Sequence, residues 1–460
     1  MNNENIKSLI SAQREFFKSN KTKDISFRLE MLNKLKRAVI KYQDDIIKAL
    51  YDDMKKPATE AYIAEVYIVL NEIDILLKDT SQWAKPRRVK TSPVLFSAKS
   101  FIYPEPYGVA LIISPWNYPF QLLIDPLAGA IAAGNCSVLK PSELAPATSV
   151  LIAKMIKEEF DPRFIAVVEG GIESSTALLA EKFDYIFYTG STSVGRVVMR
   201  AAAENLTPLT LELGGKSPVI IDEDANLEIA ARRIVKGKFF NAGQTCIAPD
   251  YLYVHSSIID NMNSILKEKI SEFYGEDPYV SSAYARIIND RHFSRLSKLI
   301  SGNIIYGGKT VPAERYISPT IINNATWNDP VMQEEIFGPI LPVMPFTDLE
   351  SVISEINSRP KPLALYYFSN NSAKQEKILR ETSSGGVCIN DTMEHIISEY
   401  LPFGGVGESG MGAYHGRASF DAFSHAKSVL KKSFRFDVKL KYAPYRVSLS
   451  ALKKILKILS

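Results

Sequence analysis

Hydrophobic residues in the N-terminal part of the chain recur every three or four positions between charged residues. Ile6, Leu9 and Ile10 have this spacing, and it returns from Leu29 to Leu35. Such spacing places apolar side chains on one face of a helix. Residues 1–84 are therefore predicted to be helical, and no residue pattern within them is typical of catalysis.

Short apolar runs rich in β-branched residues follow this helical region. Residues 94–102 and 108–113 are predicted strands, with a turn at Pro104-Glu105-Pro106. Further apolar runs then alternate with helical patterns. The predicted strands cover residues 137–139, 164–168, 185–188, 219–221, 251–255, 363–368 and 386–389. The predicted helices cover residues 147–158, 194–203 and 225–240, and another begins at Ile258.

This alternation of strands and helices indicates βαβ units and parallel sheets. The fold class is predicted to be α/β, with two lobes joined near Glu212. Ligands of open parallel sheets bind at the carboxyl ends of the strands. We therefore expect a cofactor between the lobes, provided that the carboxyl edges of the sheets face the cleft.

Residues 106–124 carry no charge and have about the length of a membrane span. They include Pro106, Pro115 and Pro119, and prolines leave backbone groups unsatisfied in lipid. The stretch is therefore predicted to be buried protein core. The charged N-terminus also lacks the apolar region of a secretory signal.

Composition narrows the functional classes. The chain has 460 residues, 46% hydrophobic and 23% charged, which excludes disordered and collagen-like proteins. A net charge of +4 is too small to indicate nucleic acid binding. Cys136, Cys246 and Cys388 are far apart, and the five histidines lack metal-ligand spacing. We expect no disulfide and no metal, and a cytoplasmic location fits these thiols.

Two residues are candidates for catalysis. Cys246 lies in a loop of small residues after a predicted helix, and Glu212 lies between two leucines. A cysteine taken alone is most often a small core residue. A carboxylate among leucines is ordinarily satisfied by an ion pair, for which Lys216 is available. Each residue taken singly therefore also fits a structural role.

The segment Gly190-Ser191-Thr192-Ser193-Val194-Gly195 follows a predicted strand and begins a predicted helix. Main-chain N–H groups at such a helix start can bind phosphate. The segment is no P-loop, because Arg196 and Val197 replace the required Lys and Ser or Thr. It also lacks the GxGxxG dinucleotide fingerprint. A phosphate site and a simple helix-capping turn both remain open.

Other polar residues near turns fit either a structural or a functional role. The amide of Asn117 can brace a turn or donate to an oxyanion. Lys140 and Glu143 end a predicted strand and form either a solvated turn or a clamp on ribose hydroxyls. Glu335 precedes another turn, next to Phe337. No single motif decides the function.

Taken in order, the motifs between residues 115 and 412 resemble the aldehyde dehydrogenase superfamily. The most specific phrases are residues 211–218, Gly243-Gln244-Thr245-Cys246, Glu335-Ile336-Phe337-Gly338-Pro339 and Pro402-Phe403-Gly404-Gly405-Val406-Gly407. Leu206-Thr207-Pro208 and residues 411–416 resemble the class 3 branch, which includes fatty and aromatic aldehyde dehydrogenases. This resemblance implies a Rossmann-like cofactor lobe, an α/β catalytic lobe and a β-strand oligomerisation arm.

The resemblance also implies roles in the oxidation of an aldehyde to a carboxylic acid. Cys246 would add to the aldehyde, forming a thiohemiacetal and then a thioester. The amide of Asn117 and the main-chain N–H of Cys246 would hold the oxyanion, and Glu212 would activate the hydrolytic water. We expect nearby N–H dipoles and a positive nicotinamide to lower the pKa of the thiol.

The implied cofactor is NAD. The residues implied to bind it are Trp116, Lys140, Glu143, Gly190, Ser191, Thr192, Ser193, Val194, Gly195, Glu335 and Phe337. Of these, the glycine-flanked loop holds the phosphates, Lys140 and Glu143 the adenosine ribose, and Glu335 the nicotinamide ribose. A carboxylate at Glu143 repels a 2′-phosphate, but NADP stays open because class 3 relatives often accept both cofactors.

The implied domain division is a cofactor-binding domain of residues 1–84 and 105–212 and a catalytic domain of residues 213–420. Residues 85–104 and 421–440 would form the arm of a homodimer, followed by a tail of residues 441–460. Gly407-Glu408-Ser409-Gly410 departs from the usual Gly-Asn-Ser-Gly. We expect this departure to affect loop packing or dimer contacts more than chemistry.

The C-terminal tail is strongly basic. Residues 426–460 contain ten basic residues and one acidic residue, so the rest of the chain is net acidic. Leucine and isoleucine recur at helical spacing from Leu449 to Leu459. The tail either packs on this protein or its dimer partner, or contacts anionic lipid as a basic amphipathic helix. The second reading allows membrane association and favours a lipophilic aldehyde, either long-chain aliphatic, isoprenoid or aromatic.

Two other functions are weighed against this one. A CoA-acylating or phosphate-using relative forms the same thioester but commonly lacks a base at Glu212. A non-catalytic binding protein on the same fold has no need of Cys246, Asn117 and Glu212 together.

Overall fold

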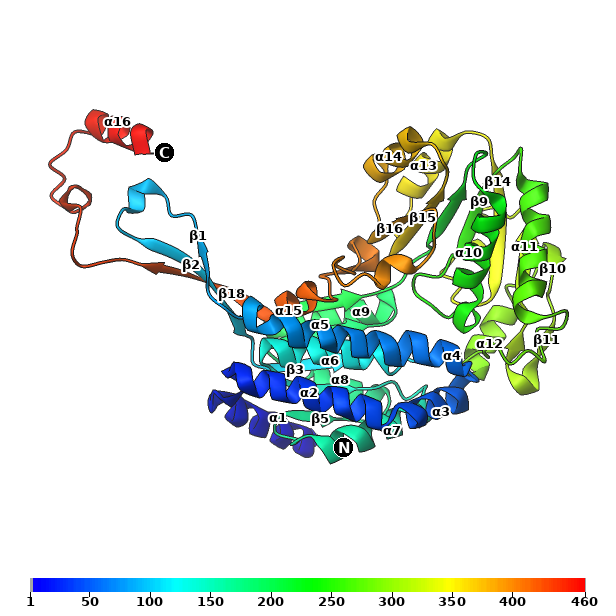
Figure 1. Cartoon of the computed structure of the whole chain (residues 1–460), viewed down its shortest axis with the longest axis horizontal. Helices are drawn as coiled ribbons and strands as arrows, with labels where there is room; N and C mark the ends of the chain where they lie inside the picture. Colours follow the sequence, from blue (N-terminus) through cyan, green and yellow to red (C-terminus); the bar gives the residue numbers. More distant parts are fainter. Residues whose placement is uncertain (1–2, 460) are drawn as a thin grey trace.

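The computed structural model describes residues 3–459, and the side chains of residues 4–458. Figure 1 shows two α/β lobes side by side and an arm that projects from one of them. The N-terminal helices lie on the lobe that carries the arm. This arrangement confirms the predicted α/β class.

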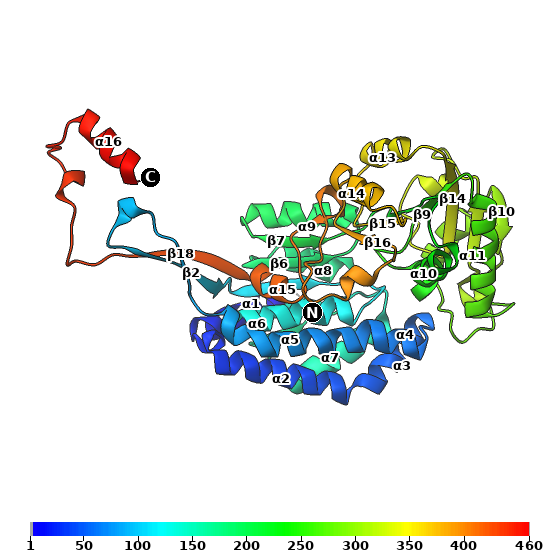
Figure 2. The same ribbon diagram turned by 45° about the horizontal axis from the view of Figure 1, so that its top comes forward.

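The helical prediction for the N-terminal region is confirmed within the described residues. The helices are α1 (Asn3–Lys18), α2 (Ile25–Lys41), α3 (Gln43–Met54), α4 (Ala58–Ala61) and α5 (Ile68–Trp83), with a π-helical turn at Tyr62–Tyr67. Leu32, Leu35 and Val39 of α2 are fully buried. Helices α2 and α5 pack on α6 (Gln121–Ala133), which covers one face of the first sheet (Figure 2).

The first sheet has six strands in the order β17-β7-β6-β3-β4-β5. Its strands are β3 (Val109–Ile113), β4 (Cys136–Lys140), β5 (Ile165–Val167), β6 (Tyr185–Thr189), β7 (Leu209–Glu212) and β17 (Gly410–Met411). Within this sheet only the short β17 runs antiparallel. The connecting helices are α6, α7 (Pro146–Glu159), α8 (Ile172–Leu179) and α9 (Thr192–Glu204). Residues 106–124 include β3 and the start of α6 and are mostly buried in this lobe, as predicted.

The second sheet has seven strands in the order β10-β13-β14-β9-β8-β15-β16. Its strands are β8 (Pro218–Ile221), β9 (Tyr251–His255), β10 (Asn303–Tyr306), β13 (Thr320–Asn323), β14 (Ile340–Phe346), β15 (Ala364–Phe368) and β16 (Gly386–Ile389). The helices are α10 (Leu227–Phe239), α11 (Ile259–Tyr274), α12 (Asp290–Ser297), α13 (Leu349–Asn357) and α14 (Ser372–Glu381). A small hairpin joins β11 (Thr310–Val311) to β12 (Tyr316–Ile317).

The two sheets present opposite edges to the cleft between them. The carboxyl ends of β3, β6 and β7 lead into the cleft residues Asn117, Gly190 and Glu212. In contrast, the cleft residues Cys246 and Glu335 lie just before β9 and β14 begin. The expectation that carboxyl edges face the cleft is therefore correct for the first sheet and wrong for the second.

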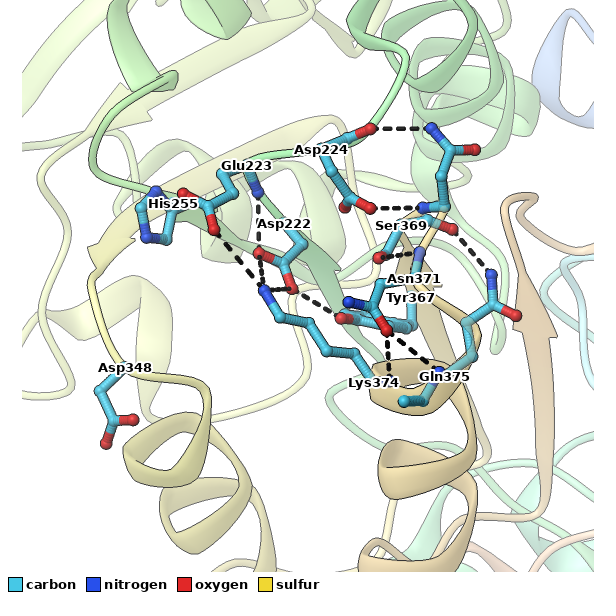
Figure 3. Close-up of polar contacts among 12 residues, drawn as sticks. Asp222, Glu223, Asp224, His255, Asp348, Tyr367, Ser369, Asn371, Lys374 and Gln375 are labelled. Atoms are coloured by element: carbon cyan, nitrogen blue, oxygen red, sulfur yellow. Dashed lines mark hydrogen bonds and ion pairs between the residues drawn. The ribbon is translucent and has the colours of Figure 1, made fainter.

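The carboxyl edge of the second sheet is occupied by its own polar side chains (Figure 3). Asp222 follows β8 and accepts hydrogen bonds from the Tyr367 hydroxyl at 2.7 Å and from Lys374 Nζ at 3.0 Å. Lys374 also lies 3.7 Å from the Glu223 carboxylate. These bonds join β8, β15 and α14 on the side of the lobe away from Cys246.

The arm is a three-stranded antiparallel sheet of β1 (Arg87–Val89), β2 (Lys99–Pro106) and β18 (Ser424–Lys431). The prediction for residues 94–106 is partly wrong. Residues 93–95 form a 3₁₀ turn, and β2 continues through Pro104 and Pro106. Proline is tolerated there because β1 pairs only as far as Ile102, so the rest of β2 has a neighbour on one side only.

The chain ends at the far tip of the arm (Figure 1). After α15 (Arg417–Ala422) and β18, helix α16 spans Leu449–Leu459, as the tail periodicity predicts, although the side chain of Leu459 lies outside the described residues. Helix α16 contacts the turn Pro93–Leu95. No helix in the described part of the chain is both long and apolar enough to cross a membrane.

Candidate active site

Cys246 and Glu212 lie where two cavities meet. A cleft of about 350 Å³ lies on one side, and a narrow pocket of about 70 Å³ lies on the other. Both cavities are lined by Cys246 and Glu212. A reactant in either cavity therefore reaches the same thiol and the same carboxylate.

The cleft gathers most of the residues predicted to bind the cofactor. Its predicted lining residues are Trp116, Asn117, Gly190, Ser191, Thr192, Ser193, Glu212, Cys246, Glu335 and Phe337. Lys140 and Glu143 do not line it. Lys140 ends β4 and Glu143 follows it, further along the same sheet edge, with Lys140 Nζ 3.5 Å from the Glu143 carboxylate.

Glu212 is buried without a polar partner. Its side chain is 1% exposed, and neither carboxylate oxygen has a hydrogen-bond partner. The ordinary alternative, an ion pair with Lys216, is wrong, because Lys216 pairs with Asp250 instead. Burial raises the pKa of Glu212 well above its usual value. A carboxyl group in this position is a candidate acid–base group rather than part of a structural ion pair.

The loop that carries Cys246 is built on left-handed backbone. Asn241, Ala242 and Gly243 have φ values of 52°, 51° and 73°. A side chain at Gly243 would meet the Gly338 carbonyl, since a Cβ there would lie 2.4 Å from that oxygen. The tight turn brings the thiol to the cleft wall at the end of α10.

The protein alone raises the pKa of the Cys246 thiol, contrary to expectation. Burial and the carboxyl groups of Glu335 and Glu212 raise it to about 12. The main-chain N–H groups of Cys246 and Ile247 act in the opposite direction but are outweighed. The expected lowering of the pKa therefore needs a positive charge from outside the chain.

Asn117 braces the loop that carries it, the structural one of its two possible roles. Its Nδ2 donates to the Gln244 carbonyl at 3.1 Å, which braces the loop against the cysteine loop. The hydroxyls of Tyr118 and Thr245 join the same two loops at 2.6 Å. An amide nitrogen has two hydrogens, so a second N–H of Asn117 stays available beside Cys246.

The start of α9 fits a phosphate-bearing cofactor. The hydroxyl of Ser191 accepts from the Val194 N–H at 3.4 Å and caps the helix. A Cβ at Gly195 would lie 2.7 Å from the Leu213 side chain, so glycine allows α9 to pack closely on the segment after β7. Exposed N–H groups at a helix start favour anions.

Glu335 and the aromatic residues form the other wall of the cleft. One oxygen of Glu335 is buried without a hydrogen-bond partner, and burial near Asp250 raises the pKa of Glu335 to about 8. The rings of Trp116 and Phe337 meet edge to face at 5.3 Å. An unpartnered acceptor beside aromatic rings matches the hydroxyls of a ribose, so the residues present fit a nicotinamide dinucleotide.

The sequence patterns missed several residues of the cleft. His292 on α12 packs against Trp116 with ring centroids 4.9 Å apart, and Arg295 and Thr189 also line the cleft. These residues belong to no recognisable motif, so only the folded chain identifies them. Among residues 3–459, no group of three or more potential ligands could hold a metal ion.

Comparisons with known proteins show the family of this chain. The model of the aldehyde dehydrogenase family matches residues 1–429. The chain belongs to the aldehyde dehydrogenase family. It is 49% identical to 4,4'-diaponeurosporen-aldehyde dehydrogenase of Staphylococcus aureus, over 96% of this chain and 97% of that one. It is 48% identical to the mouse dimeric NADP-preferring aldehyde dehydrogenase, over 96% and 98% of the two chains.

A solved structure confirms the aldehyde dehydrogenase fold. The substrate-bound state of Staphylococcus aureus AldH has a TM-score of 0.96, 47% identity and 99% coverage of both chains. The protein is an NAD(P)-dependent aldehyde dehydrogenase that oxidises aldehydes.

Glu408, the departure from the usual aldehyde dehydrogenase phrase, makes an ion pair beside the cofactor loop. Its carboxylate lies 2.8 Å from Arg196 of α9, and its carbonyl accepts from the Thr192 hydroxyl at 3.1 Å. The pair therefore ties the loop before β17 to the start of α9.

The raised pKa of Cys246 predicts a steep pH dependence in the cofactor-free enzyme. Alkylation by iodoacetamide should be slow at pH 7 and rise about tenfold with each pH unit up to pH 10, because the thiolate fraction does so. Mass spectrometry of the modified peptide measures the rate, and Cys246→Ser gives the background from the other cysteines. A rate that becomes constant below pH 9 would contradict the raised pKa.

Proposed function

We propose that Cys246 is the nucleophile, Asn117 the oxyanion donor and Glu212 the base of aldehyde oxidation. The observation that carries the proposal is the position of Cys246 and Glu212 between the cleft and the pocket. The Cys246 sulfur adds to the carbonyl carbon, and the oxygen becomes an oxyanion. The Asn117 amide and the Cys246 N–H donate to that oxygen.

NAD or NADP, when bound, supplies the hydride acceptor. As the carbonyl re-forms, the carbon loses its hydride and remains bound to sulfur as a thioester. Glu212 then takes a proton from water, and the hydroxide attacks the thioester carbon. The carbon–sulfur bond breaks, which releases the acid and the thiolate.

An unpartnered Glu212 favours water as the acyl acceptor. A base buried beside the thioester activates a small nucleophile at that point. This arrangement supports hydrolysis over CoA acylation, because a thiol acceptor does not need such a base. It also argues against a non-catalytic role, since an unsatisfied buried carboxyl group costs stability without structural benefit.

We further propose a lipophilic aldehyde as the substrate. The narrow pocket is lined almost entirely by apolar and aromatic side chains. These include Ile68, Leu122, Ile247, Leu363, Met393, Ile396 and Phe403. The segment 390–401 contributes Met393 and Ile396 to this lining. The similar Staphylococcus aureus enzyme is named for a polyene aldehyde, which supports this substrate class.

NAD is the proposed preferred cofactor. The Glu143 carboxylate lies at the sheet edge beside Gly171 and is 43% exposed. A carboxylate there accepts from a ribose 2′-hydroxyl and repels a 2′-phosphate. Lys140 partly offsets the charge of the Glu143 carboxylate, so NADP is proposed as the second cofactor. The similar mouse enzyme is named NADP-preferring.

We propose a cytoplasmic homodimer with the domain division given above. The arm sheet projects from the first lobe (Figure 1), and exposed apolar side chains lie on β18 and on the segment that follows it. Leu430 is 51% exposed, and Phe434 and Phe436 are also exposed. An exposed apolar strand edge favours pairing with a second copy, and the similar mouse enzyme is named dimeric.

The basic tail is proposed to contact an anionic membrane surface. On α16, Leu452 and Ile455 are each 38% exposed, and Leu449 is 67% exposed. The chain's own core therefore does not cover this apolar face. Lys453 and Lys454 flank it, and basic amphipathic helices bind at lipid interfaces.

Chain length is the test of the substrate class. Reduced-cofactor absorbance with saturated aldehydes should show kcat/KM rising up to about fourfold per added CH₂ until the pocket is filled. Ile396→Asp should remove this gain, whereas Ile397→Asp, which changes the next residue outside the pocket, should keep it. Higher kcat/KM for glyceraldehyde than for decanal would contradict a lipophilic substrate.

Glu212→Gln separates the two chemical stages. A burst of one reduced cofactor per site should persist, while steady turnover falls about 10²–10⁴-fold, because hydrolysis loses its base. Stopped-flow absorbance measures both stages. Glu223→Gln, a carboxylate at the far edge of the second sheet, is the control and should turn over normally. Undiminished steady turnover of Glu212→Gln would refute the base assignment.

Vesicle flotation tests the tail. The full chain should float with vesicles that contain phosphatidylserine and remain below with phosphatidylcholine alone. Truncation of residues 445–460, or Lys453→Glu with Lys454→Glu, should abolish flotation, because each lysine contributes about 1 kcal/mol near an anionic surface. If the full chain and the truncated chain both fail to float, the membrane proposal is wrong.

A further inference from the structure

Lys56 and Glu65 form a buried ion pair that the chemistry above does not use. Both side chains are 0% exposed. Glu65 lies in the π-helical turn Tyr62–Tyr67, and such turns are frequent at functional sites. A buried pair is stable only if hydrogen bonds satisfy its remaining polar atoms. In this protein those bonds all go to the loop that carries Asn117.

The ion pair holds this loop at two points. Lys56 Nζ donates to the main-chain carbonyl of Asn117 at 2.9 Å. Glu65 Oε2 accepts from the main-chain N–H groups of Phe120 at 2.9 Å and Gln121 at 3.3 Å. The peptide on the carboxyl side of Asn117 and the start of α6 are therefore both attached to the N-terminal helical segment.

The same segment also reaches the cysteine loop. Glu60 accepts from the main-chain N–H of Asn241 at 3.0 Å. Asn241 Nδ2 donates to the carbonyl of Asn117 at 3.0 Å and to that of Gln244 at 3.2 Å. Asn241 thus ties together the two loops that supply the two oxyanion donors, and residues 56–65 hold both loops.

We propose that Lys56, Glu65 and Asn241 are positioning residues for the oxyanion. Their bonds fix the main chain of Asn117 so that its amide and the Cys246 N–H converge on one oxygen. This inference rests on the proposed roles of Asn117 and Cys246. Donors stabilise an oxyanion only when they are oriented before the charge forms. A misplacement of about 1 Å lowers the rate by about 10²-fold.

The main test is the double variant Lys56→Met with Glu65→Gln. It removes both charges, so that no unpaired charge remains buried. The hydride burst with decanal should slow by about 10²-fold. The dissociation constant for NAD and the rate of Cys246 alkylation by iodoacetamide should stay within about twofold, because neither process forms an oxyanion. A general loss of structure would instead change all three measurements.

A cycle with Asn117→Ala shows whether the effect passes through Asn117. In that background the double variant should slow the burst by no more than about threefold, since the donor is already absent. Arg28→Met is the matched control. Arg28 is also a buried cation that donates to main-chain carbonyls, at Thr22 and Ala132, but it lies far from the cleft. The burst rate of Arg28→Met should equal that of wild type.

Asn241→Gly is a second probe, used also if the double variant does not fold. Glycine adopts the φ of 52° at this position, and the substitution removes the tie while the ion pair stays. The burst should again slow with alkylation unchanged. The positioning role is refuted if the burst rate of these variants stays within threefold of the wild-type rate. It is also refuted if the double variant slows the burst by about 10²-fold in the Asn117→Ala background as well. A burst rate of Asn117→Ala equal to that of wild type would instead refute the proposed role of Asn117, on which the inference rests.

Discussion

The carboxyl edge of one parallel sheet meets the amino edge of another, and the chemistry depends on this contact. Strand β7 ends at Glu212 and β9 begins just after Cys246, so the two groups meet without being neighbours in sequence. Strand β17 returns to pair Gly410 with Glu212, and the Leu213 N–H donates to the Ser409 carbonyl. The backbone of Glu212 is thereby held from both sides while its carboxylate stays unpartnered. The lobes thus supply one candidate reacting group each, where the two cavities meet.

Burial has a clear electrostatic consequence in this site. Glu212, Glu335 and Cys246 all have raised pKa values, chiefly because a charge in the low-dielectric interior is costly. The carboxyl groups of Glu335 and Glu212 add to the cost of a Cys246 thiolate, since all three would be anions. A site of this kind favours the neutral forms until a positive charge arrives. In the proposed mechanism the protein supplies the acceptors and the nucleophile, and the cofactor supplies the balancing positive charge.

The proposed oxyanion donors are held by elements that are distant in sequence. Lys56 and Glu65 come from a helical region whose pattern indicated no catalytic role, yet their bonds end on the loop of Asn117. The helical periodicity does not distinguish Lys56 from the other charged residues of its region. The burial of Lys56 follows from the packing of the π-helical turn against α6, and no local pattern encodes that contact. The strands β10, β13 and β14 were also not among the predicted strands.

The sequence by itself determined the class of fold, the succession of most helices and strands, and the family, because periodicity and ordered motifs are local properties. It also determined which residue types were available for the chemistry, Cys246 and Glu212 above all. Only the tertiary structure decided that Lys216 pairs with Asp250 rather than with Glu212, which leaves that carboxylate unpartnered. It likewise decided that the surroundings of Cys246 raise the pKa of the thiol. Both outcomes depend on which groups are buried together, and burial is a property of the packed chain as a whole.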